Sequence, residues 1–272
     1  MLCFVIPIKS ESVSYDWGSV CKLFEASLQS AYQQTDTDFK VIAIHHEKPK
    51  LKKRYDWRVE FLEADCSPPH TYRNQETQSQ YESMVRDKAR KRALGMVRVG
   101  ELKPDFTMFM DADDLVSSYL ARFVNTNKQS NGWIIKRGYQ YRYGSRFIYY
   151  NDRYNCGTNA IINTKLTYCP RDTSQRETSQ SLILTNGHQI IEQKMASLGY
   201  PLEHLPFPGA VKIIGHQDRL TPIRQMVRQE RLPKNKSLRM LLGQLRRTKP
   251  LNRKLKQEFN IIRDLLSSAN SV

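Results

Sequence analysis

Three carboxylates stand close together in the middle of this 272-residue chain, directly after a short apolar run. The run covers residues 106–110, and Asp111, Asp113 and Asp114 follow it at once. A run this short and this apolar is typical of a buried strand. Burying an unpaired carboxylate is costly, so the three side chains are expected at the strand end, where α/β sheets bind ligands. Such a cluster is suited to a hard divalent cation and, through it, to phosphate oxygens.

A simpler interpretation of the same residues is helix capping. Asp111 or Asp113 could be the N-cap of a helix that begins at Leu115. One cap needs only one carboxylate and the chain provides three, so ligand binding is the favoured interpretation.

Two basic residues could serve the same site. Lys88 and Arg92 are four residues apart on a helix expected over residues 78–97, so they share one helix face. Facing the carboxylates, they would stabilise phosphate charge as it develops. The alternative is that they form an ordinary solvated face.

Two histidines are further candidates. His188 stands near the expected start of a helix, and an imidazole titrates close to neutral pH, which suits a general base. Its alternative role is a bond to the backbone at the helix start. His216 follows a late strand and could ligate a metal, or could be an ordinary loop residue. His45 and His46 are interpreted as structural or base-packing residues.

The pattern around the carboxylates predicts a parallel α/β sheet. Apolar or alternating runs over residues 2–8, 39–44 and 57–62 predict three strands ahead of the carboxylate-bearing one. A helix is expected over residues 16–34, with Asp16 as its N-cap. Strands that alternate with helices in this way are typical of a parallel sheet covered by helices.

The second half of the chain is expected to be more mixed. Tyrosines, β-branched residues and two glycines predict antiparallel strands over residues 133–150. The remaining expectations are a helix over residues 116–125, a helix from residue 187 to a C-cap at Gly199, and a Pro-broken strand over residues 202–214.

Composition divides the chain in two. Residues 222–272 hold 13 Lys and Arg against three acidic residues, a net charge of +10, whereas the other 221 residues share the remaining +6. We therefore expect a domain over residues 1–221 and a basic helical extension over residues 222–272. Five cysteines without a CxxC pair argue against a disulfide framework or a zinc site and favour a reducing, cytoplasmic compartment. The apolar start of the chain is too short for a membrane span.

These features together resemble the GT-A fold glycosyltransferases that use nucleotide sugars, the family-2-like members in particular. The resemblance covers about residues 1–220 and depends on the Asp-x-Asp-Asp motif after two Rossmann-like strands. It implies a mostly parallel central sheet flanked by helices. It also implies a nucleoside-diphosphate sugar as donor, a UDP-sugar above all, with Mn²⁺ or Mg²⁺ as cofactor and a glycan or lipid-linked acceptor.

The resemblance also implies roles for single residues. Pro7 and Ile8 would lie along the nucleotide base, and Asp65 would contact the base or the ribose. Asp111 would touch the ribose or the donor sugar. Asp113 would hold the metal on the diphosphate, and His216 would complete the metal or diphosphate site.

The chain departs from the family pattern at two places. The second strand ends in His45-His46-Glu47 where many members carry acidic residues. Residues 186–189 read Asn-Gly-His-Gln where many members carry a Glu-Asp pair that supplies the catalytic base. His188 is the residue at that place able to accept a proton, which makes it the candidate base.

Two other functions compete with sugar transfer. A phosphatase of the haloacid-dehalogenase type would use Asp111 as nucleophile and Asp113 as acid/base, but there the motif normally ends the first strand. A nucleic-acid-binding module would use the basic extension and leave the carboxylates without a purpose. No nucleic-acid partner is expected, whereas the extension could touch the anionic inner face of a membrane.

Overall fold

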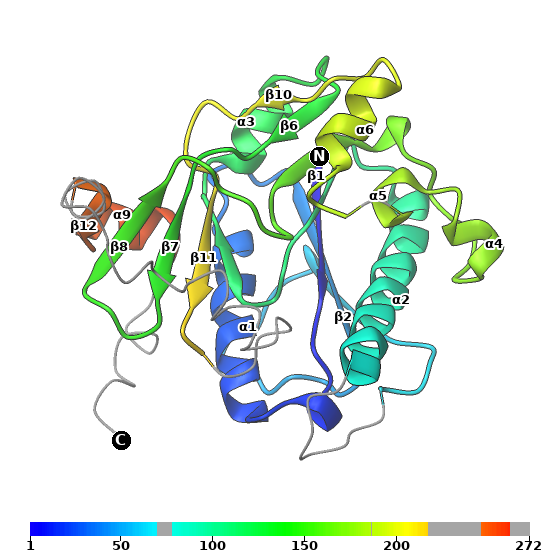
Figure 1. Ribbon diagram of the computed structural model, residues 1–272, viewed down its shortest axis with the longest axis horizontal. Coiled ribbons are helices and arrows are strands. Elements are labelled where there is room, and N and C mark those ends of the chain that lie inside the picture. Colours follow the sequence, from blue (N-terminus) through cyan, green and yellow to red (C-terminus); the bar gives the residue numbers. More distant parts are fainter. Residues whose placement is uncertain (70–77, 186, 217–245, 262–272) are drawn as a thin grey trace.

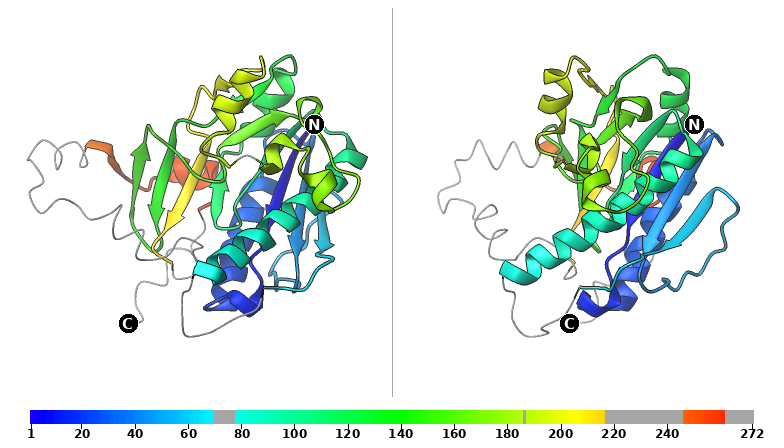
Figure 2. Two further views of the ribbon diagram at one scale, coloured as in Figure 1. Left: turned by 45° about the vertical axis from the view of Figure 1, so that its right-hand side comes forward. Right: turned by 90° about the vertical axis from the view of Figure 1, so that its right-hand side faces the viewer.

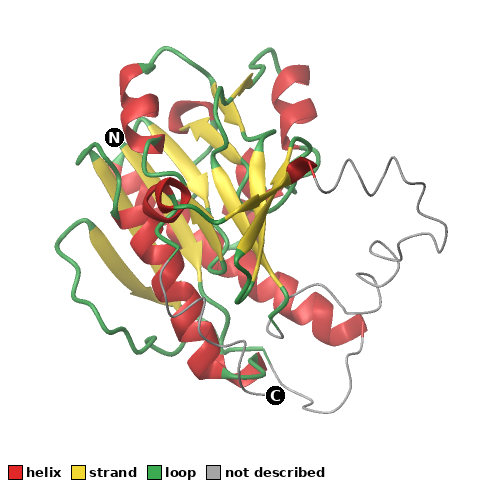
Figure 3. Cartoon of the chain, turned by 90° about the vertical axis from the view of Figure 1, so that its left-hand side faces the viewer, coloured by secondary structure: helices red, strands yellow, loops and turns green. Residues whose placement is uncertain are grey.

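The computed structural model describes residues 1–69, 78–185, 187–216 and 246–261. Its strands form two sheets with helices packed around them (Figure 3). The larger sheet has seven strands in the order β10-β6-β9-β4-β1-β2-β3. Their bounds are β1 Leu2–Pro7, β2 Phe39–His45, β3 Val59–Glu63, β4 Phe106–Phe109, β6 Gly132–Ile134, β9 Ala160–Asn163 and β10 Glu203–His204.

The strands from the first part of the chain, β1 to β4, are parallel. β1 pairs with β2 on one side and with β4 on the other, and β3 continues the parallel order beyond β2. β9 then pairs antiparallel with both β4 and β6. The carboxyl ends of β1, β2, β3 and β4 therefore meet at one edge. The predicted mixed, mostly parallel central sheet flanked by helices is confirmed.

Helices cover both faces of the larger sheet. Successive apolar side chains of the central strand β1 point to opposite faces, so both faces have to be covered. Leu2, Phe4 and Ile6 of β1 pack against α1 (Trp17–Tyr32), while Cys3 and Val5 pack toward α2 (Gln78–Leu102). All five side chains are fully buried. Figure 2 shows α2 lying across its face of the parallel strands. This packing fixes the position of α2 relative to the carboxyl edge of the parallel strands.

The first helix begins as expected. Asp16 is the N-cap of α1, and its carboxylate accepts a hydrogen bond from Gly18 N. The shorter helices are α3 Leu120–Thr126, α4 Gln175–Thr178, α5 Leu182–Thr185, α6 Ile191–Ser197 and α9 Arg253–Glu258, with 3-10 turns at Glu11–Val13 and Thr164–Leu166.

The second sheet has five strands in the order β12-β8-β7-β11-β5 (Figure 1). β7 and β8 form the expected antiparallel hairpin. β11 lies beside β7 in parallel and beside β5 in antiparallel orientation. The bounds are β5 Asp114–Val116, β7 Gly138–Arg142, β8 Phe147–Asn151, β11 Ala210–Ile214 and β12 Thr248–Pro250.

Two predicted helices begin later than expected. The helix expected from residue 116 begins only at Leu120, because Leu115 and Val116 pair with β11 and are buried as a strand. The helix expected from Gly187 begins at Ile191. His188 consequently lies in the turn before a helix.

The C-terminal part of the described chain packs on the second sheet. The extension was expected to be helical, but Thr248–Pro250 form a strand because they pair with β8. β12 pairs with β8, and α9 places Leu255 against the same apolar cluster as Phe259 and Tyr139. The predicted boundary between residues 221 and 222, and most of the basic extension, lie outside the described residues. Among the helices that the structure describes, none has the length and apolar character to cross a membrane.

Candidate functional site

The carboxylate cluster lies at the carboxyl edge of the parallel strands, directly after β4. Met110 N still donates to Val5 O, and Asp114 N then donates back to Asp111 O across a tight turn. β5 begins at Asp114 and leads the chain into the second sheet. The turn sends the three carboxylates in different directions, and each has its own partners.

Asp111 is held by the two basic residues of α2. Lys88 Nζ lies 2.6 Å and Arg92 Nη2 3.3 Å from Asp111 Oδ1. Burial alone would raise the pKa of this carboxyl, but the charges of Lys88 and Arg92 outweigh it and hold the pKa at about 2. Arg92 also stacks on the ring of Phe109, with 4.8 Å between the guanidinium carbon and the ring centre. The predicted approach of Lys88 and Arg92 to the cluster is therefore seen in the structure.

A loop from the second half of the chain closes on Asp111 from the other side. Asp111 N donates to Thr158 Oγ1 over 2.9 Å. Gly157 lies so close that a Cβ at this position would overlap the Asp111 carboxylate. Only glycine allows this approach. The residues around Gly157 carry no local sequence signal for this contact.

Asp113 lies beside His216, at ion-pair distance. β11 runs antiparallel to β5, so the chain beyond Ile214 returns beside the turn that precedes Asp114. Gly215, with a φ of +85°, then turns His216 inward, and His216 Nε2 lies 3.0 Å from Asp113 Oδ2. Only 7% of the His216 side chain is exposed, whereas 33% of the Asp113 side chain is exposed.

This pair of side chains fits a divalent cation. Asp113 is an ion-pair neighbour of His216, but neither ring nitrogen of His216 has a hydrogen-bond partner among the described residues. Buried polar atoms normally find partners, so an orphaned imidazole indicates a missing ligand. A carboxylate and an imidazole are both metal ligands, and Mg²⁺ typically takes only one or two protein carboxylates alongside phosphate oxygens and water.

Asp114 points away from the other two carboxylates. It is 3% exposed, and its Oδ2 lies 3.2 Å from the Sγ of Cys156, which in turn lies 3.0 Å from the Tyr154 hydroxyl. Burial, followed by the charges of Asp113 and Asp111, raises the pKa of Asp114 to about 8. Asp114 is therefore neutral at pH 7 and acts as a buried polar group behind the site.

His188 lies near Asp111, whose charge acts on the imidazole. It lines a small pocket together with Arg92, Gly157 and Asn159. Asn159 Nδ2 donates to the backbone carbonyl of His188 over 3.2 Å and fixes this turn. Burial lowers the pKa of His188, and the nearby Asp111 charge only partly opposes it. The imidazole is therefore neutral at pH 7 and free to accept a proton.

The residues expected at the nucleotide base lie farther along the strand edge. Pro7 ends β1, and the carbonyl of the buried Ile8 accepts a hydrogen bond from Lys91 Nζ at 2.7 Å. Asp65 follows β3, and its Oδ2 accepts a hydrogen bond from Thr173 Oγ1 at 3.0 Å. The structure thus places all three on the same sheet edge as Asp111, with Asp65 at its outer end.

Comparison with known proteins gives a likeness of fold. No family model matches the chain, and no curated protein matches it. Among solved structures, it is similar to TarS 1-349 of S. aureus at 12% identity and TM-score 0.38, over 78% of this chain and 60% of that chain. A longer TarS structure matches at 11% identity and TM-score 0.39, over 90% and 43% of the two chains.

A third similar structure is described as a nucleotide-diphospho-sugar transferase from Desulfovibrio desulfuricans G20. It matches at 11% identity and TM-score 0.36, over 90% of this chain and 94% of that chain. This chain spans less than two thirds of either TarS structure.

Proposed function

We propose that the protein is a metal-dependent glycosyltransferase that moves a sugar from a nucleoside-diphosphate sugar to an acceptor hydroxyl. The observation that carries the proposal is the pairing of Asp113 with the orphaned imidazole of His216, next to an Asp111 held by two cations. A divalent-cation site beside fixed positive charge, at the carboxyl edge of a parallel sheet, is what a diphosphate requires.

Asp113 and His216 are the residues that would hold Mn²⁺ or Mg²⁺. When bound, such an ion supplies Lewis-acid neutralisation of the leaving diphosphate. Asp113 keeps enough exposure for a ligand to reach it, while the near-complete burial of His216 holds the imidazole in place.

Lys88 and Arg92 are assigned to the diphosphate and to the orientation of Asp111. Their two positive charges exceed the single negative charge of Asp111, so the group retains net positive charge for an incoming phosphate. Asp111 is ionised at all physiological pH values and can accept hydrogen bonds from sugar hydroxyls. Pro7, Ile8 and Asp65 are assigned to the base and ribose of the donor.

His188 is assigned as the general base that takes the proton from the acceptor hydroxyl. It is neutral at pH 7, lies in a pocket beside Asp111 and belongs to the turn that precedes α6. The pocket side chains Phe109, Ile183 and Ile191 would shield the reacting atoms from water.

The test is a panel of nucleotide sugars with Mn²⁺ or Mg²⁺, monitored for release of the nucleoside diphosphate. Donor hydrolysis needs no known acceptor, so it reads out the donor site directly. We expect release from one donor class, UDP-sugars first, that chelation and the Asp113→Asn variant both abolish. Release of inorganic phosphate from sugar phosphates, without diphosphate release, would instead establish the phosphatase alternative.

The acceptor and the place of action are part of the proposal. A cytoplasmic enzyme whose extension over residues 222–272 carries a net charge of +10 would be attracted to anionic lipid. We therefore assign a glycan or lipid-linked acceptor and peripheral contact with the inner face of a membrane.

A further inference from the structure

A second group of metal-ligand side chains lies on the same sheet edge, away from Asp113 and His216. His46 follows β2, Cys66 follows β3 and Asp87 lies on α2. One ligand atom from each residue lies within 4.8 Å of those of the other two. The group is therefore compact enough for one ion.

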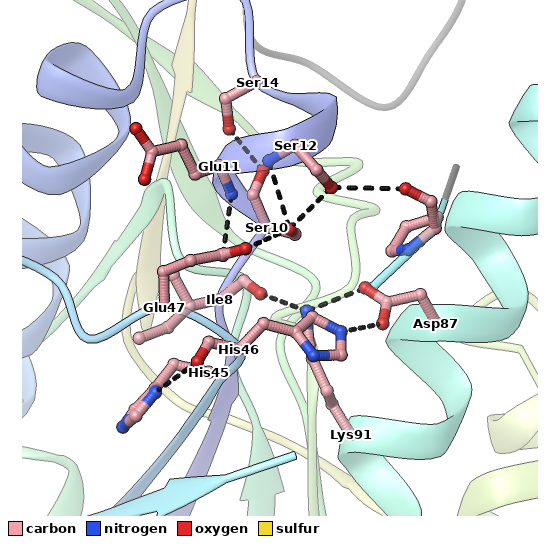
Figure 4. A network of polar contacts seen from close by, with 11 residues as sticks. Ile8, Ser10, Glu11, Ser12, Ser14, His45, His46, Glu47, Asp87 and Lys91 are labelled. Atoms are coloured by element: carbon pink, nitrogen blue, oxygen red, sulfur yellow. Dashed lines mark hydrogen bonds and ion pairs between the residues drawn. The ribbon is translucent and has the colours of Figure 1, made fainter. Parts of the chain in front are cut away.

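Two of the three side chains are already fixed by their surroundings. His46 Nε2 lies 2.6 Å from Asp87 Oδ1, and their side chains are only 5% and 10% exposed. The other Asp87 oxygen accepts a hydrogen bond from Lys91 Nζ at 2.7 Å, and Lys91 also donates to Ile8 O (Figure 4). Asp87 therefore has one oxygen engaged by Lys91 and the other directed at His46.

The segment that carries Cys66 is anchored on both sides. Before Cys66, Ala64 N donates to His45 O at 2.7 Å. After it, Pro69 O accepts a hydrogen bond from Ser12 Oγ at 3.2 Å. Because both ends of the segment are tied to the strand edge, the thiol stays beside the imidazole and the carboxylate.

We propose that His46, Cys66 and Asp87 form a zinc-binding site. Zn²⁺ accepts imidazole nitrogen, thiolate sulfur and carboxylate oxygen in four-coordinate sites, and water would fill the fourth position. Binding replaces the hydrogen bond between His46 and Asp87, so the His46 proton moves from Nε2 to Nδ1 and leaves Nε2 to ligate the ion. The Cys66 thiol proton is released to solvent. The two anionic ligands neutralise the ion, and Lys91 remains on the outer Asp87 oxygen as a positioning residue.

Ligand chemistry separates this site from the one at Asp113. A thiolate selects soft or borderline ions such as Zn²⁺, whereas carboxylate and phosphate oxygens suit Mg²⁺ and Mn²⁺. α2 serves both sites from neighbouring faces: Lys88 and Arg92 reach Asp111, while Asp87 and Lys91 reach the ends of β1 and β2. A zinc ion here would fasten the chain after β3 to β2 and α2. The ion would thereby stabilise the carboxyl edge of the strands without taking part in the transfer step.

Cobalt is a suitable probe, because Co²⁺ occupies zinc sites and gives a near-ultraviolet charge-transfer band only when a thiolate ligates it. The full-length protein would be stripped with chelator and titrated with Co²⁺ in excess Mg²⁺, which occupies oxygen-ligand sites. We expect one equivalent of Co²⁺ with the band, displaced by Zn²⁺. Cys66→Ser should lose the band, whereas Cys169→Ser, at the other half-exposed free cysteine, should keep it.

Calorimetric titration with Zn²⁺ provides the second measurement. His46→Ala and Asp87→Asn should weaken Zn²⁺ binding by more than the roughly 10–100-fold cost of losing an outer-shell partner. Asp113→Asn should bind Zn²⁺ like the wild type, and Zn²⁺ should raise the melting temperature of both. Absence of the thiolate band in the wild type, or its persistence in Cys66→Ser, would overturn the proposal whatever the enzymatic activity proves to be.

Discussion

Replacing Asp114 by asparagine should stabilise the metal-free protein at neutral pH. Asp114 is 3% exposed, and its pKa in the folded protein is about 8, against 3.8 for an unperturbed aspartate. Asparagine has nearly the same shape and cannot ionise. The substitution therefore removes the cost of keeping a proton on a buried carboxyl without opening a cavity.

The magnitude follows from linkage between protonation and folding. Because the folded pKa is higher than the unfolded pKa, the unfolded chain loses its proton first as the pH rises. The contribution of Asp114 to the free energy of unfolding is thus greatest below pH 3.8 and falls by about 1.4 kcal/mol per pH unit until the pH reaches about 8. Asp114→Asn does not lose stability in this way, so its free energy of unfolding should exceed that of the wild type by roughly 4 kcal/mol at pH 7.

The assay is urea unfolding of the wild type and Asp114→Asn at half-unit steps from pH 4.5 to 8, with chelator present. The chelator matters because a cation at Asp113 would lower the pKa of Asp114. The control is Asp113→Asn, which removes the largest charge acting on Asp114 after burial. That variant should shift the loss of stability toward lower pH.

One result would refute the reasoning. If the free energies of unfolding of the wild type and Asp114→Asn run parallel from about pH 5 to 8, the pKa of Asp114 is not raised in the folded protein and its carboxyl is ionised throughout this range.

Three further predictions concern function. In calorimetric titrations, Asp113→Asn should abolish Mn²⁺-dependent binding of nucleoside diphosphate, and His216→Ala should weaken metal binding and diphosphate binding together. If Mn²⁺-dependent binding survives in Asp113→Asn, Asp113 is not a metal ligand. His188→Ala should slow transfer to acceptor about 10²–10⁴-fold while leaving the donor Kd nearly unchanged, and a wild-type rate would place the base elsewhere. The full-length protein should float with anionic vesicles and not with neutral ones, at about 1 kcal/mol for each basic residue of 222–272 near the surface; equal, negligible flotation with both would exclude the membrane contact.

The parallel sheet could be predicted from the sequence because its signals are local. Residues 2–8 and 39–44 are apolar runs of strand length, and Asp16 is followed by an apolar pattern of helical period. The position of Lys88 and Arg92 on one helix face also needed only helical spacing. Each of these features depends on residues within one element.

The arrangement around the carboxylates was harder to predict from the sequence, because it depends on pairing between segments that are distant in the chain. β5 is three residues long, and it is a strand rather than a helix start only because β11 lies beside it. The pairing of His216 with Asp113 follows from the same contact. Gly157 and Cys66 carry no local sequence signal, since their importance arises from the neighbours that the fold brings to them.

The packing of α9 implies a late step in folding. Ser117, directly after β5, donates to Glu258 from 141 residues away, and Gln29 of α1 accepts a hydrogen bond from Asn260 across 231 residues. Contacts so distant in sequence slow folding, and a nascent chain lacking them displays the apolar face that Phe259 later covers. The chain is therefore most prone to aggregation before residues 253–261 have left the ribosome. Truncation before residue 261 should lower the yield of folded protein before it changes any catalytic property.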